Sequence, residues 1–99
     1  MTNVYYDPEK FGLQSVGEIE WSDGCYQFDL TVVWKTENGL LYSEDSGCSC
    51  PVPFESRALS DLTEITPAGL QAYLKERNAS NYYGDRSVQI TELMGRLIS

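Results

Sequence analysis

Large apolar side chains alternate with polar ones between residues 25 and 35. The apolar positions fall on every second residue: Tyr26, Phe28, Leu30, Val32 and Trp34. Val33 is the one apolar residue between them. A period of two is typical of a β-strand with one buried and one wetter face, and β-branched and aromatic residues favour the same structure. The pattern predicts a strand from Cys25 to Lys35, around which the rest of the chain is arranged.

A similar alternation from Leu13 to Trp21 predicts the preceding strand. Ser22-Asp23-Gly24-Cys25 then gives a turn signal, because glycine readily supplies the positive φ of hairpin turns. A four-residue loop keeps the large apolar side chains on one face through three facing pairs: Trp21 with Tyr26, Ile19 with Phe28, and Gly17 with Leu30.

A second turn signal is the segment Thr36-Glu37-Asn38-Gly39. A three-residue loop ending at Gly39 would pair Trp34 with Tyr42 and Thr36 with Leu40, which again keeps the apolar face together. The third strand then runs from Leu40 to about Asp45. Three antiparallel strands form a small meander, which needs a cover on its apolar face.

Helix signals lie on both sides of this meander. Asp7-Pro8 predicts a short helical turn ending near Gly12, and Thr66-Pro67 predicts a helix that continues to Asn78. The segment Phe54 to Thr66 has apolar residues at helical spacing and is compatible with a short helix. A last helix, from about Arg86, is indicated by an amphipathic pattern: Ile90, Leu93, Met94 and Leu97.

Together these elements predict an α+β fold, a three-stranded antiparallel β-meander with two to three C-terminal helices packed on its apolar face. We expect a single domain over residues 1–99. Residues 1–53 would form the N-terminal turn, the meander and a cysteine-rich turn, and residues 54–99 the helical part.

Charge restricts the possible partners of this domain. The 99 residues include 15 acidic and 7 basic ones, for a net charge of −8. Such a balance argues against direct binding to nucleic acid or to an anionic membrane, because both need clustered lysine and arginine. No stretch approaches the roughly 20 apolar residues of a membrane span, and the N-terminus does not have the pattern of a signal peptide. We therefore expect a cytoplasmic protein, while the sequence leaves its oligomeric state open.

The residue types available for catalysis are few. The chain has no histidine, which removes the serine and cysteine mechanisms that depend on imidazole and the commonest general base. No glycine-rich phosphate-binding loop is present. We expect a protein that is not an enzyme.

Three cysteines form the one constellation with chemical potential: Cys25, Cys48 and Cys50. Extending the second hairpin places Cys25 opposite about residue 51, so the three thiols should lie at one end of the sheet. They could bind zinc together with Asp23 or Asp45, or act as a dithiol redox switch. The alternative is a buried Cys25 and a tight turn without a ligand. Cys-x-Cys is far less specific than paired Cys-x-x-Cys motifs, so the sequence favours this alternative.

Acidic residues suggest a second candidate site. Glu18 and Glu20 share the polar face of the first strand, and Asp29 is expected to be their cross-strand neighbour. Paired carboxylates can serve acid–base chemistry or bind a cation, but without a cleft they more often form a solvated surface. As a docking surface beside the exposed tyrosines Tyr82 and Tyr83, this face could bind a basic protein surface.

Several segments resemble a family of small uncharacterised proteins from phages of actinobacteria. The resemblance covers roughly residues 5 to 55 and does not include the C-terminal helices; its main segments are Tyr5 to Leu13, Gly17 to Tyr26, Val32 to Trp34 and Asp45 to Pro51. Val52 departs from it, since a small polar residue is expected there. The resemblance implies a phage-encoded accessory protein that acts in the host cytoplasm, with no catalytic residue to carry over.

Three functions remain open on the sequence. The first is protein–protein interaction with a host or phage protein. The second is a cysteine-based metal-binding or redox module, and the third is a self-associating structural or virion-related protein.

Overall fold

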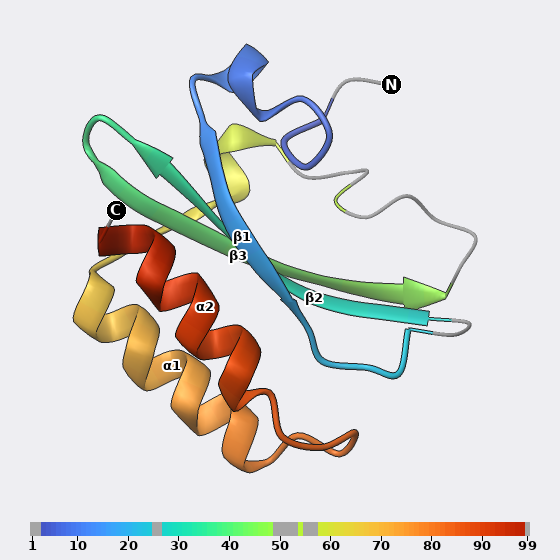
Figure 1. Ribbon diagram of the computed structural model, residues 1–99. Coiled ribbons are helices and arrows are strands. Elements are labelled where there is room, and N and C mark those ends of the chain that lie inside the picture. Colours follow the sequence, from blue (N-terminus) through green and yellow to red (C-terminus); the bar gives the residue numbers. More distant parts are fainter. Residues whose placement is uncertain (1–2, 25–26, 49–53, 55–57, 99) are drawn as a thin grey trace.

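Four strands form one antiparallel sheet in the order β1-β2-β3-β4 (Figure 1). The computed structural model describes residues 3–24, 27–48, 54 and 58–98. The strands are β1 (Gln14–Glu20), β2 (Gln27–Thr36), β3 (Gly39–Cys48) and β4 (Thr63–Ile65). Two short 3-10 turns, η1 (Pro8–Phe11) and η2 (Leu59–Asp61), and two helices, α1 (Pro67–Ala79) and α2 (Ser87–Ile98), complete the chain. The α+β class with an antiparallel sheet and helices is confirmed, but the sheet has four strands rather than three.

The additional strand lies where the sequence suggested a short helix. β4 pairs with β3 through Leu40 and Ile65, Leu41 and Glu64, and Tyr42 and Thr63. Of the apolar residues at helical spacing, Leu59 lies in η2, Leu62 lies between η2 and β4, and Ile65 lies in β4. Threonine and isoleucine are β-branched and fit an edge strand well, whereas spacing over so short a segment does not distinguish a helix from a strand.

The helix boundaries follow their sequence signals closely. η1 ends before Gly12, which has a φ of 74°. α1 begins at Pro67 behind the cap residue Thr66, whose Oγ1 accepts a hydrogen bond from the backbone N of Gly69 at 3.0 Å. In the described part of the chain, none of the helices is both long enough and apolar enough to cross a membrane.

β2 is buried on both faces of the sheet. On one face, here called the first face, lie Leu30, Val32 and Trp34, and on the other, the helix face, lie Thr31 and Val33; all five are at most 3% exposed. A strand buried on both faces is typical of a sheet covered on each side. The expectation of a wetter face on β2 is therefore wrong for Thr31 and Val33, whereas Gln27 and Lys35, near the ends of the same face, are exposed.

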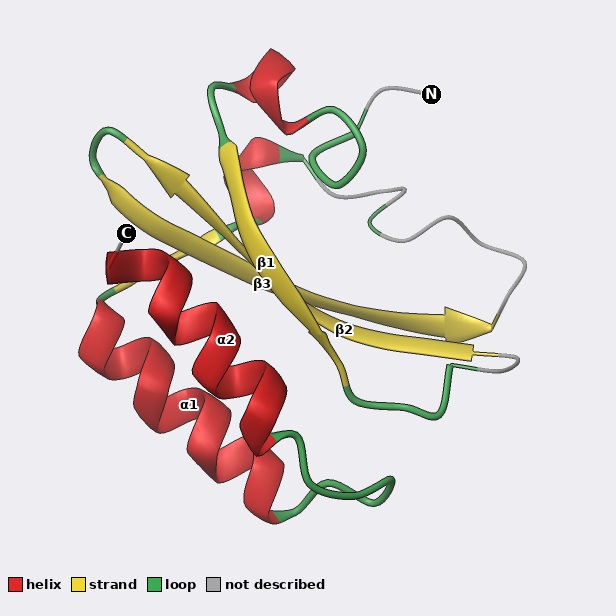
Figure 2. Cartoon of the chain, viewed as in Figure 1, coloured by secondary structure: helices red, strands yellow, loops and turns green. Residues whose placement is uncertain are grey.

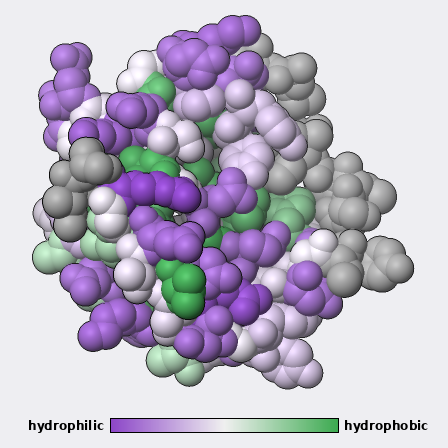
Figure 3. Space-filling view, viewed as in Figure 1, coloured by the Kyte–Doolittle hydropathy of each residue, from purple (hydrophilic) through white to green (hydrophobic). Residues whose placement is uncertain are grey.

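Both helices pack on the face of the sheet that contains Val33 (Figure 2). The alternating pattern had predicted them on the opposite face, with Leu30, Val32 and Trp34. Their core joins both helices to β1, β2 and the residue that follows β1: Ile19, Trp21, Val33, Leu70, Leu74, Ile90 and Leu93. The first face is covered instead by the N-terminal segment and parts of residues 54–62, with its own core: Val4, Leu13, Leu30, Val32, Trp34, Phe54 and Leu62. Hydrophilic residues consequently cover most of the described surface seen in Figure 3.

Strand register explains why the faces were misassigned. Ile19 lies opposite Thr31, three residues from the predicted partner Phe28. Thr36 lies opposite Gly39, so the second loop has two residues rather than three, and Tyr42 pairs with Val33. Because side chains alternate along a strand, an odd shift moves each of them to the other face. Ile19 and Tyr42 therefore point toward the helices.

A network of polar side chains, buried at Trp21 and Thr31 and partly exposed at Asp29 and Arg77, makes this burial of the helix face possible. Thr31 Oγ1 accepts a hydrogen bond from Trp21 Nε1 at 2.8 Å and shares another with Tyr73 Oη at 2.9 Å. Arg77 of α1 lies over the Trp21 ring, 5.0 Å from its centroid, and its guanidinium pairs with Asp29 Oδ2 at 2.7 Å. Since buried polar groups are stable only when they are hydrogen-bonded, α1 supplies the partners that water would otherwise provide.

Gly17 allows α2 to approach β1 closely, and we expect Gly17→Ala to lower the free energy of unfolding by about 1–3 kcal/mol. A Cβ at this position would lie 2.8 Å from Leu93 Cδ1 and 2.7 Å from Arg96 Nη1. The arginine end can swing away, but Leu93 is 1% exposed and has little room to move. Urea unfolding followed by circular dichroism measures the change.

The matched control is Gly95→Ala in α2, where a Cβ would meet nothing within 4 Å. Because alanine is the better helix former, this variant should be neutral or more stable by up to about 1 kcal/mol. Equal stabilities for the two variants would contradict the close approach at Gly17.

Candidate interaction surface

Side-chain hydrogen bonds hold the loop between α1 and α2, residues 80–86. Asn78 accepts from the backbone N of Arg86 at 2.6 Å and donates to Asp85 Oδ1 at 2.7 Å. Asn81 Nδ2 donates to the carbonyl oxygen of Gly84 at 2.8 Å, and Gly84 has a φ of 114°. These contacts cross the loop from one side to the other and fix its path.

The same loop is attached to the connection between β1 and β2. Arg86 Nε donates to the carbonyl oxygen of Glu20 at 2.8 Å, and its Nη2 donates to that of Ser22 at 3.0 Å. Gln27 Nε2 lies 2.6 Å from Tyr83 Oη. Residues more than fifty positions apart in the sequence therefore form one end of the molecule.

Two adjacent tyrosines project from this anchored loop. Tyr82 is 90% exposed and Tyr83 is 43% exposed, and their rings meet edge to face with centroids 5.1 Å apart. Val88, in the first turn of α2, is 68% exposed. Exposed aromatic rings on a fixed backbone are well suited to protein contacts, because little conformational freedom is lost when they bind.

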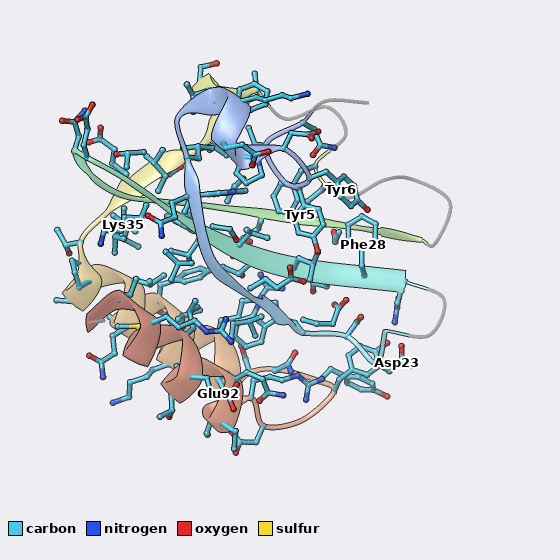
Figure 4. All side chains as sticks on the ribbon, turned by 45° about the horizontal axis from the view of Figure 1, so that its top comes forward. Tyr5, Tyr6, Asp23, Phe28, Lys35 and Glu92 are labelled. Carbon is cyan, nitrogen blue, oxygen red and sulfur yellow. The ribbon has the colours of Figure 1, made fainter. Side chains whose placement is uncertain are left out.

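Acidic side chains accompany the tyrosines. Asp23 is exposed and directly follows Ser22, and Asp85 is exposed and directly precedes Arg86, so both lie beside the contact that Arg86 makes. Figure 4 shows Asp23 near the end of β1, on the side of the loop. We call Tyr82, Tyr83, Asp23 and Asp85 the tyrosine surface.

Asp85 is ionised at neutral pH and contributes to the loop through that charge. Hydrogen bonds from Asn78, and then from Ser87, hold the pKa of Asp85 below its usual value. The stabilisation from this charge is therefore fully present above the unfolded-state pKa and is lost as pH falls through the lower folded-state pKa.

We expect Asp85→Asn to be less stable than the wild type at neutral pH, by an amount that stays constant down to about pH 4 and then shrinks. Thermal unfolding of both proteins across this range measures the difference. A difference that grows on acidification would contradict the assignment, because the sign of the effect follows from a lowered pKa.

The three acidic residues predicted as a docking face do not share a face. Glu18 and Glu20 lie opposite Val32 and Leu30, on the first face, whereas Asp29 points to the helix face and pairs with Arg77. This geometric prediction is wrong because it relied on the shifted register of the first hairpin.

Each of these acids also has a partner within the protein. Glu20 Oε2 accepts from Ser22 Oγ at 2.9 Å and from the backbone N of Asp29 at 2.7 Å, which holds the start of the β1–β2 connection. Glu18 accepts from Tyr5 Oη at 2.8 Å. Burial, followed by this hydrogen bond, raises the pKa of Tyr5. A partner-binding role for these acids stays a prediction.

The cysteine site lies almost wholly outside the described residues. Cys25 and Cys50 are outside them, and Cys48 is described by its backbone alone, paired with Gln27 at the end of β3. Among the described residues, no group of three or more histidine, cysteine, aspartate or glutamate side chains is arranged to hold a metal ion. The zinc and redox hypotheses for Cys25, Cys48 and Cys50 stay predictions.

The sequence identified the two tyrosines but not the contacts that fix them. Asn78, Asp85 and Arg86 carry no recognisable motif, and the partners of Arg86 lie 64 and 66 residues away. Asn78 and Gly84, at the two sides of the loop, were the available signal, since asparagine side chains often stabilise turns and glycine supplies positive φ.

The fold and the surface define a small α+β domain with a two-sided core and an anchored loop that exposes two tyrosines. The chain belongs to the family described as Domain of unknown function (DUF7574), whose model matches residues 2–99. The match thus includes both helices, beyond the segments that carry the phage resemblance. No curated protein and no solved structure matches the chain.

Proposed function

We propose that this protein acts by protein–protein interaction and that the tyrosine surface contacts a basic surface of its partner. The observation that carries this proposal is the 90% exposure of Tyr82 on a loop held by hydrogen bonds with α1, β2, the end of β1 and the β1–β2 connection. A flexible loop would lose conformational entropy on binding, whereas this loop is already ordered.

Charge supports a basic partner. The chain carries a net charge of −8, and two exposed carboxylates accompany the tyrosines. Complementary charge at the edge of an interface accelerates association and rejects partners of like charge. Tyrosine is enriched at the centres of interfaces, where its ring is buried and its hydroxyl forms hydrogen bonds.

The phage resemblance of the first half of the chain supports a more specific form of the proposal. In that form the protein is a phage-encoded accessory protein whose partner is a host or phage protein in the host cytoplasm. A second copy of the chain as partner would correspond to the self-associating alternative.

A capture experiment tests this function. Wild-type protein and the double variant Tyr82→Ala, Tyr83→Ala are immobilised side by side and exposed to lysate of infected host cells. We expect at least one protein with a basic surface to be retained by the wild type and not by the double variant. Identical retention on both would contradict the role of the tyrosine surface.

A matched control is Tyr6→Ala, because Tyr6 is also an exposed tyrosine, at 56%, and lies in the N-terminal segment on the other face of the sheet. This variant should retain the same proteins as the wild type. Loss of capture by Tyr6→Ala as well would show that retention does not depend on the proposed surface.

A further inference from the structure

A cleft of about 790 Å³ opens at the other end of α1 from the tyrosine surface. Its walls come from the β2–β3 turn, β4 and the first residues of α1, and from Leu97 near the end of α2. α1 has 13 residues, a length of about 20 Å at 1.5 Å per residue. The cleft is therefore a separate feature from the tyrosine surface.

Apolar side chains form the floor of the cleft. Leu40 and Ile65 are paired across β3 and β4, and Leu97 and Pro67 stand beside them. Clefts of about 300–1,000 Å³ with a mostly apolar lining are typical of sites for small molecules. The apolar part of a ligand would find its contacts here.

One lysine stands at the edge of this apolar floor. Lys35 is the cross-strand neighbour of Leu40, which in turn pairs with Ile65, so the three side chains form a row on the helix face. Figure 4 shows Lys35 between the β2–β3 hairpin and the helices. Lys35 makes no ion pair with a described residue, in a chain with more than twice as many acids as bases.

Glu64 also contributes to the lining, but its side chain leaves the sheet on the other side. It pairs with Leu41, which pairs with Trp34 on the first face. Side chains alternate along each strand, so Lys35 is the charged side chain among the described lining residues that rises from the floor on the helix face. The local charge inside the cleft therefore favours an anion, opposite to the charge of the whole chain.

We propose that this cleft binds a small amphipathic carboxylate, with its apolar body on Leu40, Ile65 and Leu97 and its carboxylate paired with Lys35. The apolar contacts supply most of the binding energy, because removal of apolar surface from water stabilises the complex in proportion to the area buried. The exposed ammonium orients the ligand and adds a smaller part.

Titration with decanoate, kept below its micelle concentration, tests this proposal by two-dimensional NMR of labelled full-length protein. We expect saturable shift changes in the backbone amides of Leu40, Ile65 and Leu97. Hexanoate should bind more weakly than decanoate because it buries less apolar surface. Decyltrimethylammonium should also bind more weakly than decanoate because its charge is repelled by Lys35. Shift changes confined to another part of the protein would overturn the proposal.

Lys35→Glu and Lys75→Glu form a matched pair for the charge. Both replace an exposed lysine and change the net charge equally, but Lys75 lies on α1 and is not part of the cleft. We expect Lys35→Glu to weaken decanoate binding about tenfold and Lys75→Glu to leave it within about twofold. Equal affinities for the two variants would overturn the assignment of Lys35.

Discussion

Replacing Val33 with aspartate is expected to prevent folding, whereas the same replacement at Val88 should change stability by less than about 0.5 kcal/mol. Val33 is fully buried beneath the helices, and Val88 is 68% exposed on α2. An isolated carboxylate beneath the helices would have to be buried without a cation or be protonated, and either outcome costs several kcal/mol, which is comparable to the total stability of a small domain.

The milder variant Val33→Ala gives a graded measure of the same burial. Removal of two methyl groups from a packed site should lower the free energy of unfolding by about 2–3 kcal/mol. Urea unfolding of Val33→Ala and Val88→Ala, followed by circular dichroism, compares the two positions. If Val33→Asp folds with the stability of Val88→Asp, the helix face of β2 is not the core described above.

The position of Val33 also shows what the sequence could and could not predict. Alternation identified β2 correctly, because a period of two is visible in a single sequence. The second face of β2 contains Asp29, Thr31 and Val33, and their average polarity suggested contact with water. Thr31 is instead hydrogen-bonded to Trp21 and Tyr73, and Asp29 forms an ion pair with Arg77.

Long-range pairing of this kind leaves no local signal in the chain. Arg77 lies 48 residues from Asp29, and no motif in either segment indicates that the two side chains pair. The register errors have a related cause: both hairpin loops were chosen to bring apolar residues to a single face, and this sheet has two buried faces. The positions of η1, α1 and α2 were predicted well because caps, prolines and periodicity are local.

The candidate surface was predictable only in part for the same reason. Two adjacent tyrosines in a loop are visible in the sequence, but their exposure depends on how Arg86 ties that loop to Glu20 and Ser22. The acidic residues selected from the sequence proved to have internal partners, which the shifted register had concealed.

Loss of both tyrosine rings is the second large effect that we expect. Tyr82→Ala, Tyr83→Ala should weaken binding to the captured partner at least about 100-fold, or about 2.7 kcal/mol, since exposed aromatic residues at interface centres commonly contribute about 2 kcal/mol or more each. Tyr82→Ala alone should weaken binding about tenfold or more. Its fold stability should hardly change, because the Tyr82 ring has few contacts to lose at 90% exposure.

The neighbouring carboxylates should affect binding in a different way. Asp23→Asn is expected to slow association and to reduce its dependence on salt, while dissociation changes little. Asp85→Asn should have the same effect on association and in addition weaken the loop, because Asp85 accepts hydrogen bonds from Asn78 and Ser87. This division would separate the edge of the interface from its centre.

The most direct test of the tyrosine surface is the affinity of the purified partner for three forms of this protein, measured by isothermal titration calorimetry. The forms are the wild type, the double variant Tyr82→Ala, Tyr83→Ala, and the control Tyr6→Ala. We expect the double variant to bind at least about 100-fold more weakly, and the control to stay within about twofold of the wild type. Equal affinity of the double variant and the wild type would contradict the binding role of the tyrosine surface.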